Sequence, residues 1–272
     1  MKHLHAKEYA ELPFTPVFIG GAPRSGTTVL NAYVCSAPEA SDLAGEAAYI
    51  YHIMPSYARM KAEPELNTYF KDVAEFEEYH AGLLKIILTD MWVHFGKPKV
   101  LVLKSPFLTM YFPELLHLLP MAKFLVSLRD IRDVIASRCK VEIKVNRMTD
   151  TKPDQFSPQQ LNPLCEEYRQ VYLPVMLAPA HPNLKIIRYE DFVTGKHDAE
   201  IAKFFGITPK PDHLWQSKHV DVSTWHGNEW NSDSYGKERT GDNVGSYKKY
   251  FNHKQIEFIE RTVKGTPLAV QS

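Results

Sequence analysis

The chain has 272 residues and a balanced charge, with 32 Lys and Arg residues against 32 Asp and Glu residues. A chain of this length can form one large domain or two small ones. Because the net charge is zero, no overall field attracts nucleic acid or an anionic membrane, and an anion site must come from a local cluster of cations. We therefore expect neither nucleic acid nor a membrane as a partner.

The cysteines and the N-terminal segment indicate the compartment. Cys35, Cys139 and Cys165 are odd in number, widely spaced and without a metal-ligand pattern, which is typical of reduced, buried thiols. Residues 1–14 carry charges and no apolar stretch, so they do not form a signal peptide. No segment approaches the roughly 20 apolar residues of a membrane helix. We expect a soluble, cytoplasmic protein.

The first strong pattern along the chain is PVFIGGAPRSGTTVL, at residues 16–30. Residues 17–19 form a short apolar run of the kind found in buried parallel strands. Gly20, Gly21 and Gly26 allow the backbone to turn tightly, and helical spacing begins directly after the loop. The order of strand, glycine loop and helix start directs several N–H groups and the positive end of a helix dipole to one point, which favours a phosphate.

Strands and helices alternate along the rest of the chain. Apolar runs at residues 100–103, 124–128 and 184–187 predict three further strands. Helical spacing predicts helices at 66–95, 107–119, 164–177, 199–205 and 254–263, and another that begins at residue 130. The stretch 213–245 has little periodicity, which is typical of a functional loop. This alternation predicts one α/β domain over residues 1–272, with a parallel sheet of about four to five strands flanked by helices.

Cationic residues stand where each predicted strand ends. Arg24 follows the first strand, Lys104 the second, Arg129 the third and Arg188 the fourth. Because the carboxyl ends of parallel strands meet at one edge of a sheet, these side chains would converge where ligands bind in open α/β sheets. Any one of them alone is better explained as an ordinary solvated strand end, so the prediction of an anion site rests on the set of four.

The residue after the glycine loop separates two kinds of phosphate site. The frame from Gly21 to Gly26 is that of a nucleotide-binding P-loop, but Thr27 occupies the position of the phosphate-gripping lysine, and the cation is Arg24, inside the loop. A P-loop kinase for a small metabolite would also need an aspartate for Mg²⁺ at a strand end, and none is evident. The kinase remains an alternative, as does a non-catalytic nucleotide-binding module.

Two motifs carry a resemblance to a known family. PRSGTT at residues 23–28 resembles the loop with which sulfotransferases hold the 5′-phosphate of the sulfate donor 3′-phosphoadenosine 5′-phosphosulfate (PAPS). FLVSLRDIRDVIAS at residues 124–137 is similar to their 3′-phosphate unit, in which an arginine ends the strand and a serine lies eight residues later, as Arg129 and Ser137 do. A guanidinium gives bidentate contacts to a phosphate, and a hydroxyl adds a further donor.

The resemblance extends from residue 16 to about residue 255 and implies a PAPS-dependent sulfotransferase that releases adenosine 3′,5′-bisphosphate and needs no metal. Tyr189 matches a tyrosine that contacts adenine. Residues 239–248 are similar to the basic loop that closes over the 3′-phosphate, although their spacing departs from the commonest cytosolic pattern. The residues that would bind PAPS are Arg24, Ser25, Gly26, Thr27, Thr28, Arg129, Ser137, Tyr189, Arg239 and Lys248.

The general base differs from that of the cytosolic aryl and steroid sulfotransferases. Those enzymes place a histidine two residues after the lysine that ends the second strand, where this chain has Pro106. The form around Lys104 resembles instead protein-tyrosine sulfotransferases and many bacterial relatives, which use the glutamate of a Gly-Glu pair after the loop helix. Glu46, which follows Gly45 at nearly that distance, is the base that this resemblance implies.

In this reading Lys104 and Arg24 stabilise the charge on the sulfuryl group and on the departing oxygen. The alternative for Glu46 is an exposed carboxylate at a helix start, where the helix dipole favours it anyway. His52 and His80 are reserve candidates for the base.

The acceptor is less determined by the sequence. The absence of a membrane anchor suggests a small molecule, such as a natural product, that is sulfated on a hydroxyl or a nitrogen. Aromatic side chains could line its pocket, although such side chains more often belong to a core: Tyr49, Tyr51, Trp225 and Trp230. A homo-oligomer is compatible with the sequence.

Overall fold

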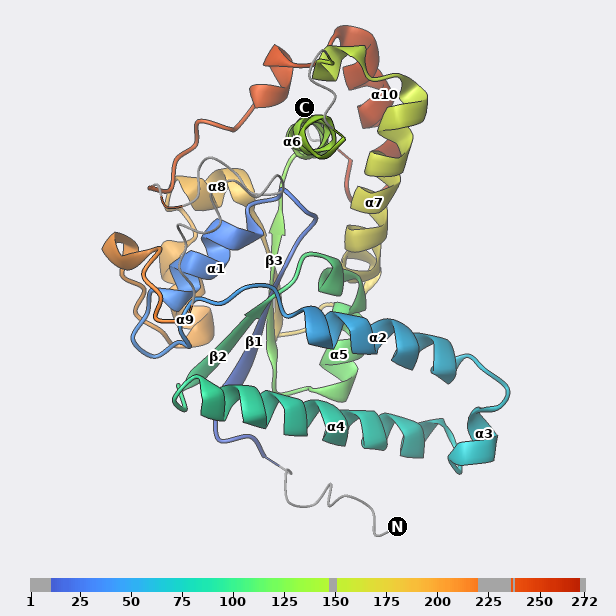
Figure 1. Ribbon diagram of the computed structural model, residues 1–272, viewed down its shortest axis with the longest axis vertical. Helices are drawn as coiled ribbons and strands as arrows, with labels where there is room; N and C mark the ends of the chain where they lie inside the picture. The colour runs from blue at the N-terminus through green and yellow to red at the C-terminus, as the bar shows by residue number, and fades with distance from the viewer. Residues whose placement is uncertain (1–10, 147–150, 220–235, 237, 270–272) are drawn as a thin grey trace.

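A computed structural model describes residues 11–146, 151–219, 236 and 238–269 of the chain. Among these residues lies one sheet of four parallel strands in the order β2-β1-β3-β4 (Figure 1). The strands are β1 Thr15–Gly20, β2 Val100–Lys104, β3 Lys123–Leu128 and β4 Leu184–Arg188. Each of the four predicted apolar runs lies within one of them, so the predicted parallel sheet is confirmed.

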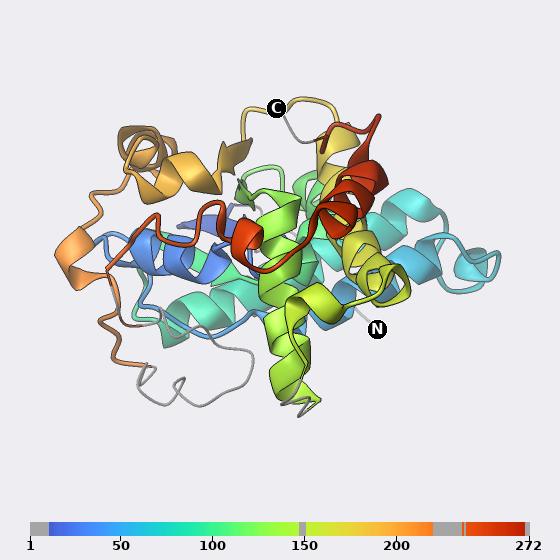
Figure 2. The same ribbon diagram turned by 90° about the horizontal axis from the view of Figure 1, so that it is seen from above.

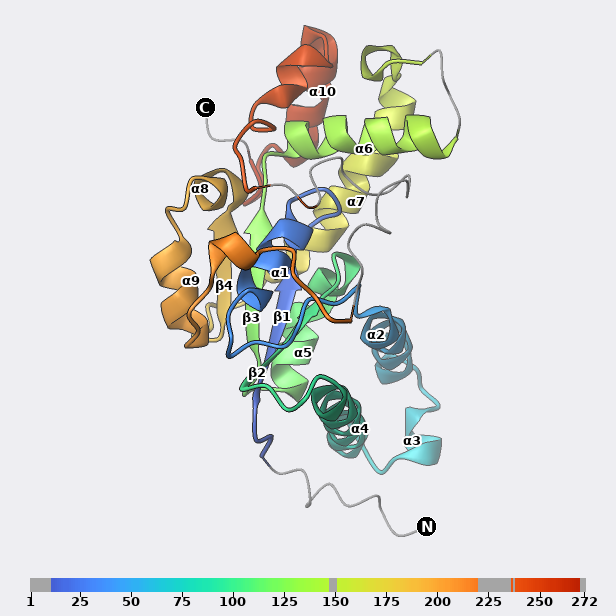
Figure 3. The same cartoon turned by 60° about the vertical axis from the view of Figure 1, so that its left-hand side comes forward.

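The strands are buried because helices cover both faces of the sheet. Side chains alternate along β1, so Phe18 belongs to one core cluster and Val17 and Ile19 to the other. The second cluster lies under three helices: α1 Thr27–Cys35, α8 Tyr189–Val193 and α9 Asp198–Phe205. Figure 1 shows these three helices on the left of β3, and Figure 3 shows α8 and α9 beside β4. The arrangement is the single α/β domain that the sequence predicts, while the domain limits of 1 and 272 stay a prediction.

The larger core cluster, which includes Phe18, lies on the other face of the sheet. Its helices are α2 Ala48–Lys61, α4 Val73–His94, α5 Phe112–Leu118, α6 Ile131–Val145, α7 Pro158–Leu177 and α10 His253–Val263. The described chain also contains short helical segments: α3 Leu66–Tyr69 and the 3₁₀ segments η2 Phe107–Tyr111, η3 Pro153–Gln155, η4 Pro211–His213 and η6 Ser246–Lys249. Within the described part of the chain, no helix is long and apolar enough to cross a membrane.

Three predicted helices have different limits in the structure. The helix predicted at 66–95 is interrupted, because Asp72 caps a new helix by accepting a hydrogen bond from the backbone N–H of Glu75. The helix predicted at 107–119 begins as η2 and continues as α5. α7 begins at Pro158, six residues before the predicted start at 164, because proline at the first helical position sacrifices no hydrogen bond.

The parallel register brings the carboxyl ends of the strands to one edge of the sheet. Ile19 of β1 pairs with Lys104 of β2, and Gly20 pairs with Val126 of β3. On the far side of β3, Leu128 pairs with Arg188 of β4. The chain leaves the strands there into α1, η2, α6 and α8, so the residues that follow each strand share one region.

Candidate active site

The glycine loop between β1 and α1 requires glycine at two positions. Gly26, the residue before α1, has φ 86°, and a Cβ there would come within 2.3 Å of the Tyr189 ring. Gly21 has φ 140°, and a Cβ there would meet the Ser127 carbonyl oxygen at 2.4 Å. Both backbone conformations are rare for other residues, and both sites lack the space for a side chain. The loop therefore runs close to β3 and α8 without intervening side chains.

Buried hydrogen bonds hold the loop from two neighbouring segments. The Gly21 N–H donates to Thr109 Oγ1 of η2 at 2.7 Å, and that hydroxyl donates to the Pro106 carbonyl at 2.6 Å. On the other side, Ser127 Oγ of β3 donates to the Ser25 carbonyl at 2.7 Å. Arg24 lies between these points with φ 73°, a left-handed conformation uncommon outside glycine. The loop is thus fixed by the protein itself.

Arg129, directly after β3, is a buried cation that braces two loops. Its side chain is 7% exposed, and its guanidinium donates to the Arg24 carbonyl at 3.0 Å and to the Asn243 carbonyl at 2.7 Å. The same group stacks on the Tyr189 ring, 4.5 Å from its centre. Its Nε is buried and makes no hydrogen bond. A buried guanidinium with an unpartnered N–H is a favourable environment for an anion.

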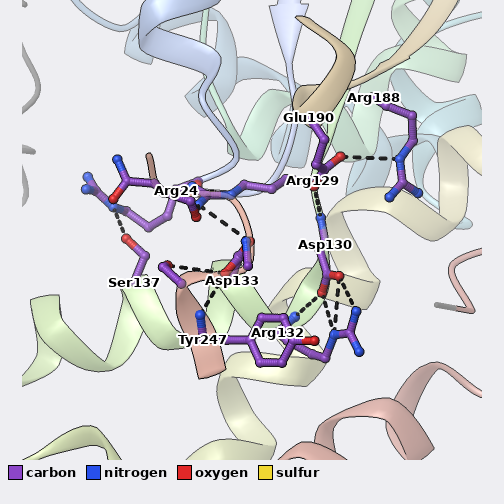
Figure 4. A network of polar contacts seen from close by, with 12 residues as sticks. Arg24, Arg129, Asp130, Arg132, Asp133, Ser137, Arg188, Glu190 and Tyr247 are labelled. Carbon is purple, nitrogen blue, oxygen red and sulfur yellow. Dashed lines mark hydrogen bonds and ion pairs between the residues drawn. The ribbon is translucent and has the colours of Figure 1, made fainter. Parts of the chain in front are cut away.

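Arg24 joins the glycine loop to the unit around Arg129. Its Nε donates to Ser137 Oγ of α6 at 3.1 Å, while its carbonyl accepts from Arg129 (Figure 4). The residues predicted to hold the 5′-phosphate and those predicted to hold the 3′-phosphate therefore form one cluster. Tyr189 completes it, since its ring lies between Gly26 and the Arg129 guanidinium. Burial raises the pKa of the Tyr189 hydroxyl, which keeps it neutral.

Lys104 and Glu46 form an ion pair at the end of β2. Lys104 Nζ lies 2.8 Å from Glu46 Oε1; the lysine side chain is 6% exposed and the carboxylate 51% exposed. The backbone fixes the pair as well, because residues 46 and 104 form a parallel β-bridge and the Ala47 N–H donates to the Lys104 carbonyl at 2.8 Å. One end of the pair is thus buried beside the glycine loop, and the other opens to solvent before α2.

Comparison with known proteins identifies the family. The model described as "Sulfotransferase family" matches residues 16–208, a span that contains β1 to β4, the glycine loop, the Lys104–Glu46 pair and the Arg129 unit. The chain belongs to the sulfotransferase family.

Solved structures of sulfotransferases share the fold. A sulfotransferase domain from the curacin biosynthetic pathway superposes with a TM-score of 0.54 at 16% identity, over 94% of this chain and all of that one. The sulfotransferase domain of the Synechococcus PCC 7002 olefin synthase gives a TM-score of 0.51 at 16% identity, over 94% of this chain and 98% of that one. At such low identity, the likeness concerns the fold alone.

A curated relative matches a shorter segment. A Caenorhabditis briggsae protein with the provisional name protein-tyrosine sulfotransferase is 27% identical over 131 residues, which is 47% of this chain and 44% of the relative. The match thus spans less than half of that relative's length.

Two late residues of the predicted PAPS site, Arg239 and Lys248, have their described contacts outside the cluster around Arg129. Arg239 forms two hydrogen bonds with the Asp198 carboxylate of α9, at 2.7 and 2.8 Å, and stacks over the rings of Tyr33 and Phe192. Lys248 is exposed in η6, with its ammonium 6.0 Å from the centre of the Tyr247 ring. Their assignments to the 3′-phosphate stay predictions.

The remaining predicted residues of the sulfotransferase lie as follows. Thr27 and Thr28 are buried at the start of α1, at the end of the helix that presents its N–H groups. His52 is exposed on α2, and His80 of α4 packs against the ring of Phe76, where burial lowers its pKa. The predicted pocket residue Tyr49 is exposed and Tyr51 half-buried, whereas Trp225 and Trp230 fall outside the described residues.

Two residues of the site were missed from the sequence. Thr109 holds the glycine loop, and Asp133 of α6 holds the segment around Gly245, to which its carboxylate is hydrogen-bonded. Asp133 lies one helical turn from both Arg129 and Ser137, so the helix period could have placed it at the site. Thr109 carries no such signal, because its partner Gly21 is 88 residues away in the sequence.

Proposed function

We propose that this sulfotransferase moves the sulfuryl group from PAPS to a hydroxyl or nitrogen of a small-molecule acceptor and releases adenosine 3′,5′-bisphosphate. The observation that carries the proposal is the contact of 2.8 Å between Lys104 Nζ and Glu46 Oε1, beside the glycine loop. A buried cation and a half-exposed carboxylate are the two groups that sulfuryl transfer asks of a protein: one stabilises developing negative charge, and the other takes a proton.

The residues around the loop fit the donor. The N–H groups at the start of α1 and the hydroxyls of Thr27 and Thr28 would hold the 5′-phosphate. The 3′-phosphate would contact Arg129, whose buried Nε has no hydrogen-bond partner in the described structure, and Ser137. When bound, PAPS supplies the sulfuryl group that is transferred.

The transfer itself needs a proton acceptor and charge stabilisation. Glu46 would take the proton of the acceptor hydroxyl while the acceptor oxygen forms a bond to sulfur. This bond would form in line with the breaking bond between sulfur and the bridging phosphate oxygen. Lys104, aided by Arg24, would stabilise the negative charge on that departing oxygen. Because Lys104 is almost fully buried, its electrostatic effect is less screened by water than that of a surface lysine.

The acceptor class is supported by the relatives. Two solved domains with this fold are named for a biosynthetic pathway and an olefin synthase, which favours a natural product. The name of the C. briggsae relative refers to a protein-tyrosine sulfotransferase. A panel of test acceptors must therefore also include a tyrosine peptide. The cytoplasmic location and a homo-oligomer stay predictions.

Nucleotide titration tests the donor. Isothermal calorimetry in the presence of EDTA should show binding of adenosine 3′,5′-bisphosphate, because the proposed contacts are all to protein groups. Mass spectrometry with PAPS and a panel of phenols, alcohols, amines and a tyrosine peptide should then identify a product that carries one additional sulfuryl group. Binding of Mg²⁺·ATP without binding of the bisphosphate would replace the proposal with the kinase, and bisphosphate binding without any product would favour the non-catalytic module.

A further inference from the structure

Arg24, Arg129, Ser137 and Tyr189 form what we call the nucleotide cluster. A late segment of the chain, residues 239–247, crosses this cluster, and we call this segment the strap. It is drawn in orange and red, and it runs from the side of α8 and α9 to the top of α6 (Figures 1 and 2). One end is held on α9 by the hydrogen bonds between Arg239 and Asp198. The other end lies on α6, where Asp133 is its partner.

Asp133 is a buried carboxylate whose hydrogen bonds go to the strap. It accepts from the Gly245 N–H at 2.7 Å, from the Tyr247 N–H at 2.9 Å and from Ser246 Oγ at 3.2 Å. Its side chain is 1% exposed. Removing these donors would leave the buried carboxylate with Arg129 as its nearby opposite charge, at 3.9 Å, and without hydrogen bonds from the strap, so the carboxylate and the strap depend on each other.

The position of this carboxylate is unexpected for a phosphate site. Arg129 stands four residues before Asp133 and Ser137 four residues after it, so an acidic group lies between the two residues proposed to bind the 3′-phosphate (Figure 4). A free carboxylate there would repel the phosphate and compete for the guanidinium. Donors from the strap prevent both effects by engaging its oxygens.

The strap also contacts Arg129 more closely than Asp133 does. Asp133 Oδ2 is 2.7 Å from the Gly245 nitrogen but 3.9 Å from the nearest Arg129 nitrogen. That guanidinium donates instead to the Asn243 carbonyl of the strap, at 2.7 Å. The strap therefore supplies donors to the carboxylate and an acceptor to the cation, while the direct ion pair between the two side chains is long, at 3.9 Å.

We propose that Asp133 is a positioning residue for the sulfate donor: it docks the strap on α6, and the docked strap orients Arg129 toward the 3′-phosphate. The inference rests on the proposed function and adds the strap and its anchor to it. It concerns the 3′-phosphate, since Asp133 and Arg129 are the residues proposed to connect the strap to that phosphate. The two phosphates therefore provide an internal comparison.

The experiment measures two nucleotides in calorimetric titrations of the full chain. Adenosine 3′,5′-bisphosphate has both phosphates, and 5′-AMP lacks the 3′-phosphate. Asp133→Asn replaces one accepting oxygen by an NH₂ group that would face a backbone N–H. We expect it to weaken binding of the bisphosphate at least about tenfold while the affinity for 5′-AMP changes less than about twofold. Arg129→Ala should weaken binding of the bisphosphate more than binding of 5′-AMP, with some loss for both because Arg129 also donates to the Arg24 carbonyl of the glycine loop. Asp154→Asn, at an exposed aspartate of η3, should change neither affinity.

Tryptic cleavage provides a readout without nucleotide. Asp133→Asn should accelerate cleavage after Lys248, beside the strap, relative to the wild-type protein. If that variant does not fold, Asp198→Asn releases the other end of the strap and should lower the affinity for the bisphosphate selectively, though to a smaller extent.

Equal losses for both nucleotides, or unchanged discrimination despite a lower melting temperature, would show that Asp133 serves stability alone and would overturn the proposal. A wild-type protein that binds the bisphosphate no better than 5′-AMP would refute the 3′-phosphate assignment itself. A wild-type protein that binds neither nucleotide would refute the proposed function.

Discussion

At the scale of single residues, the two members of the Lys104–Glu46 pair differ in their exposure to solvent. Lys104 is almost fully buried, and a buried ammonium is stable only beside an opposite charge. Glu46 supplies that charge while half of its side chain remains exposed, so it can also meet an acceptor. The structure thus shows a carboxylate that pairs with the buried cation and is open to solvent on its other side.

Glu46→Gln removes both the charge beside Lys104 and the proton acceptor, so the two roles are separated by comparing nucleotide binding with turnover. Gln keeps the size and the hydrogen bond to Lys104 but cannot take a proton, so single-turnover sulfation at saturating PAPS should fall about 10²–10⁴-fold, as for the loss of a general base. Binding of the bisphosphate should be nearly unchanged, and His52→Gln should retain normal turnover. Near-normal turnover of Glu46→Gln would assign the proton to another group, whereas lost nucleotide binding would show that Glu46 supports the phosphate loop.

At the scale of elements, η2 connects the two halves of the candidate site. Its Thr109 is fully buried; the hydroxyl accepts from Gly21 of the glycine loop and donates to Pro106, two residues after Lys104. A Cβ at Gly20 would lie 2.3 Å from this hydroxyl, so the two segments are in close contact. The loop and the end of β2 are therefore positioned by one side chain.

Thr109→Val should destabilise the protein by about 1–3 kcal/mol, because it leaves the buried Gly21 N–H unpaired while preserving the shape of the side chain. The Pro106 carbonyl loses the hydroxyl but keeps its hydrogen bond from the Thr109 backbone N–H. Urea unfolding monitored by fluorescence measures the change, and Thr109→Ser should restore most of it. Thr194→Val is the matched control, since the hydroxyl of this exposed threonine also donates to a carbonyl, that of Asp191. A loss as large in the control as in Thr109→Val would contradict a special role for the buried contact.

At the scale of the whole molecule, the nucleotide cluster draws on segments from most of the chain. The glycine loop follows β1, Arg129 follows β3, Tyr189 follows β4, and the strap comes from the C-terminal part. A ligand that contacts all of them binds the folded chain and not the unfolded one, so its binding free energy adds to the stability of the fold.

Adenosine 3′,5′-bisphosphate at a hundredfold its Kd should therefore stabilise the protein by about 2.7 kcal/mol. For a domain of this size, that corresponds to a rise in Tm of about 5 °C or more, measured by differential scanning fluorimetry. Chelation of metals should leave the shift intact. A shift that appears only with Mg²⁺ would argue against the proposed donor site.

The local parts of this site can be predicted from the amino-acid sequence. The order of apolar run, glycines and helix start predicts the phosphate loop, because each of these signals acts within a few residues. Arg129 ends the third apolar run and Ser137 lies in the helix that follows, so a short stretch of sequence places both near the start of α6. Four apolar runs separated by helices determine a parallel sheet, and a parallel sheet brings the strand ends together.

Which distant groups are in contact depends on the tertiary structure. Lys104 and Glu46 are 58 residues apart, and Asp133 and Gly245 are 112 apart, so their contacts depend on how the whole chain closes rather than on any local preference. The same holds for Arg239, whose motif resembles a phosphate contact but whose guanidinium pairs with Asp198 of α9. A local pattern specifies backbone conformation and side-chain spacing; the partner of a long charged side chain is selected by the charges that packing brings within its reach.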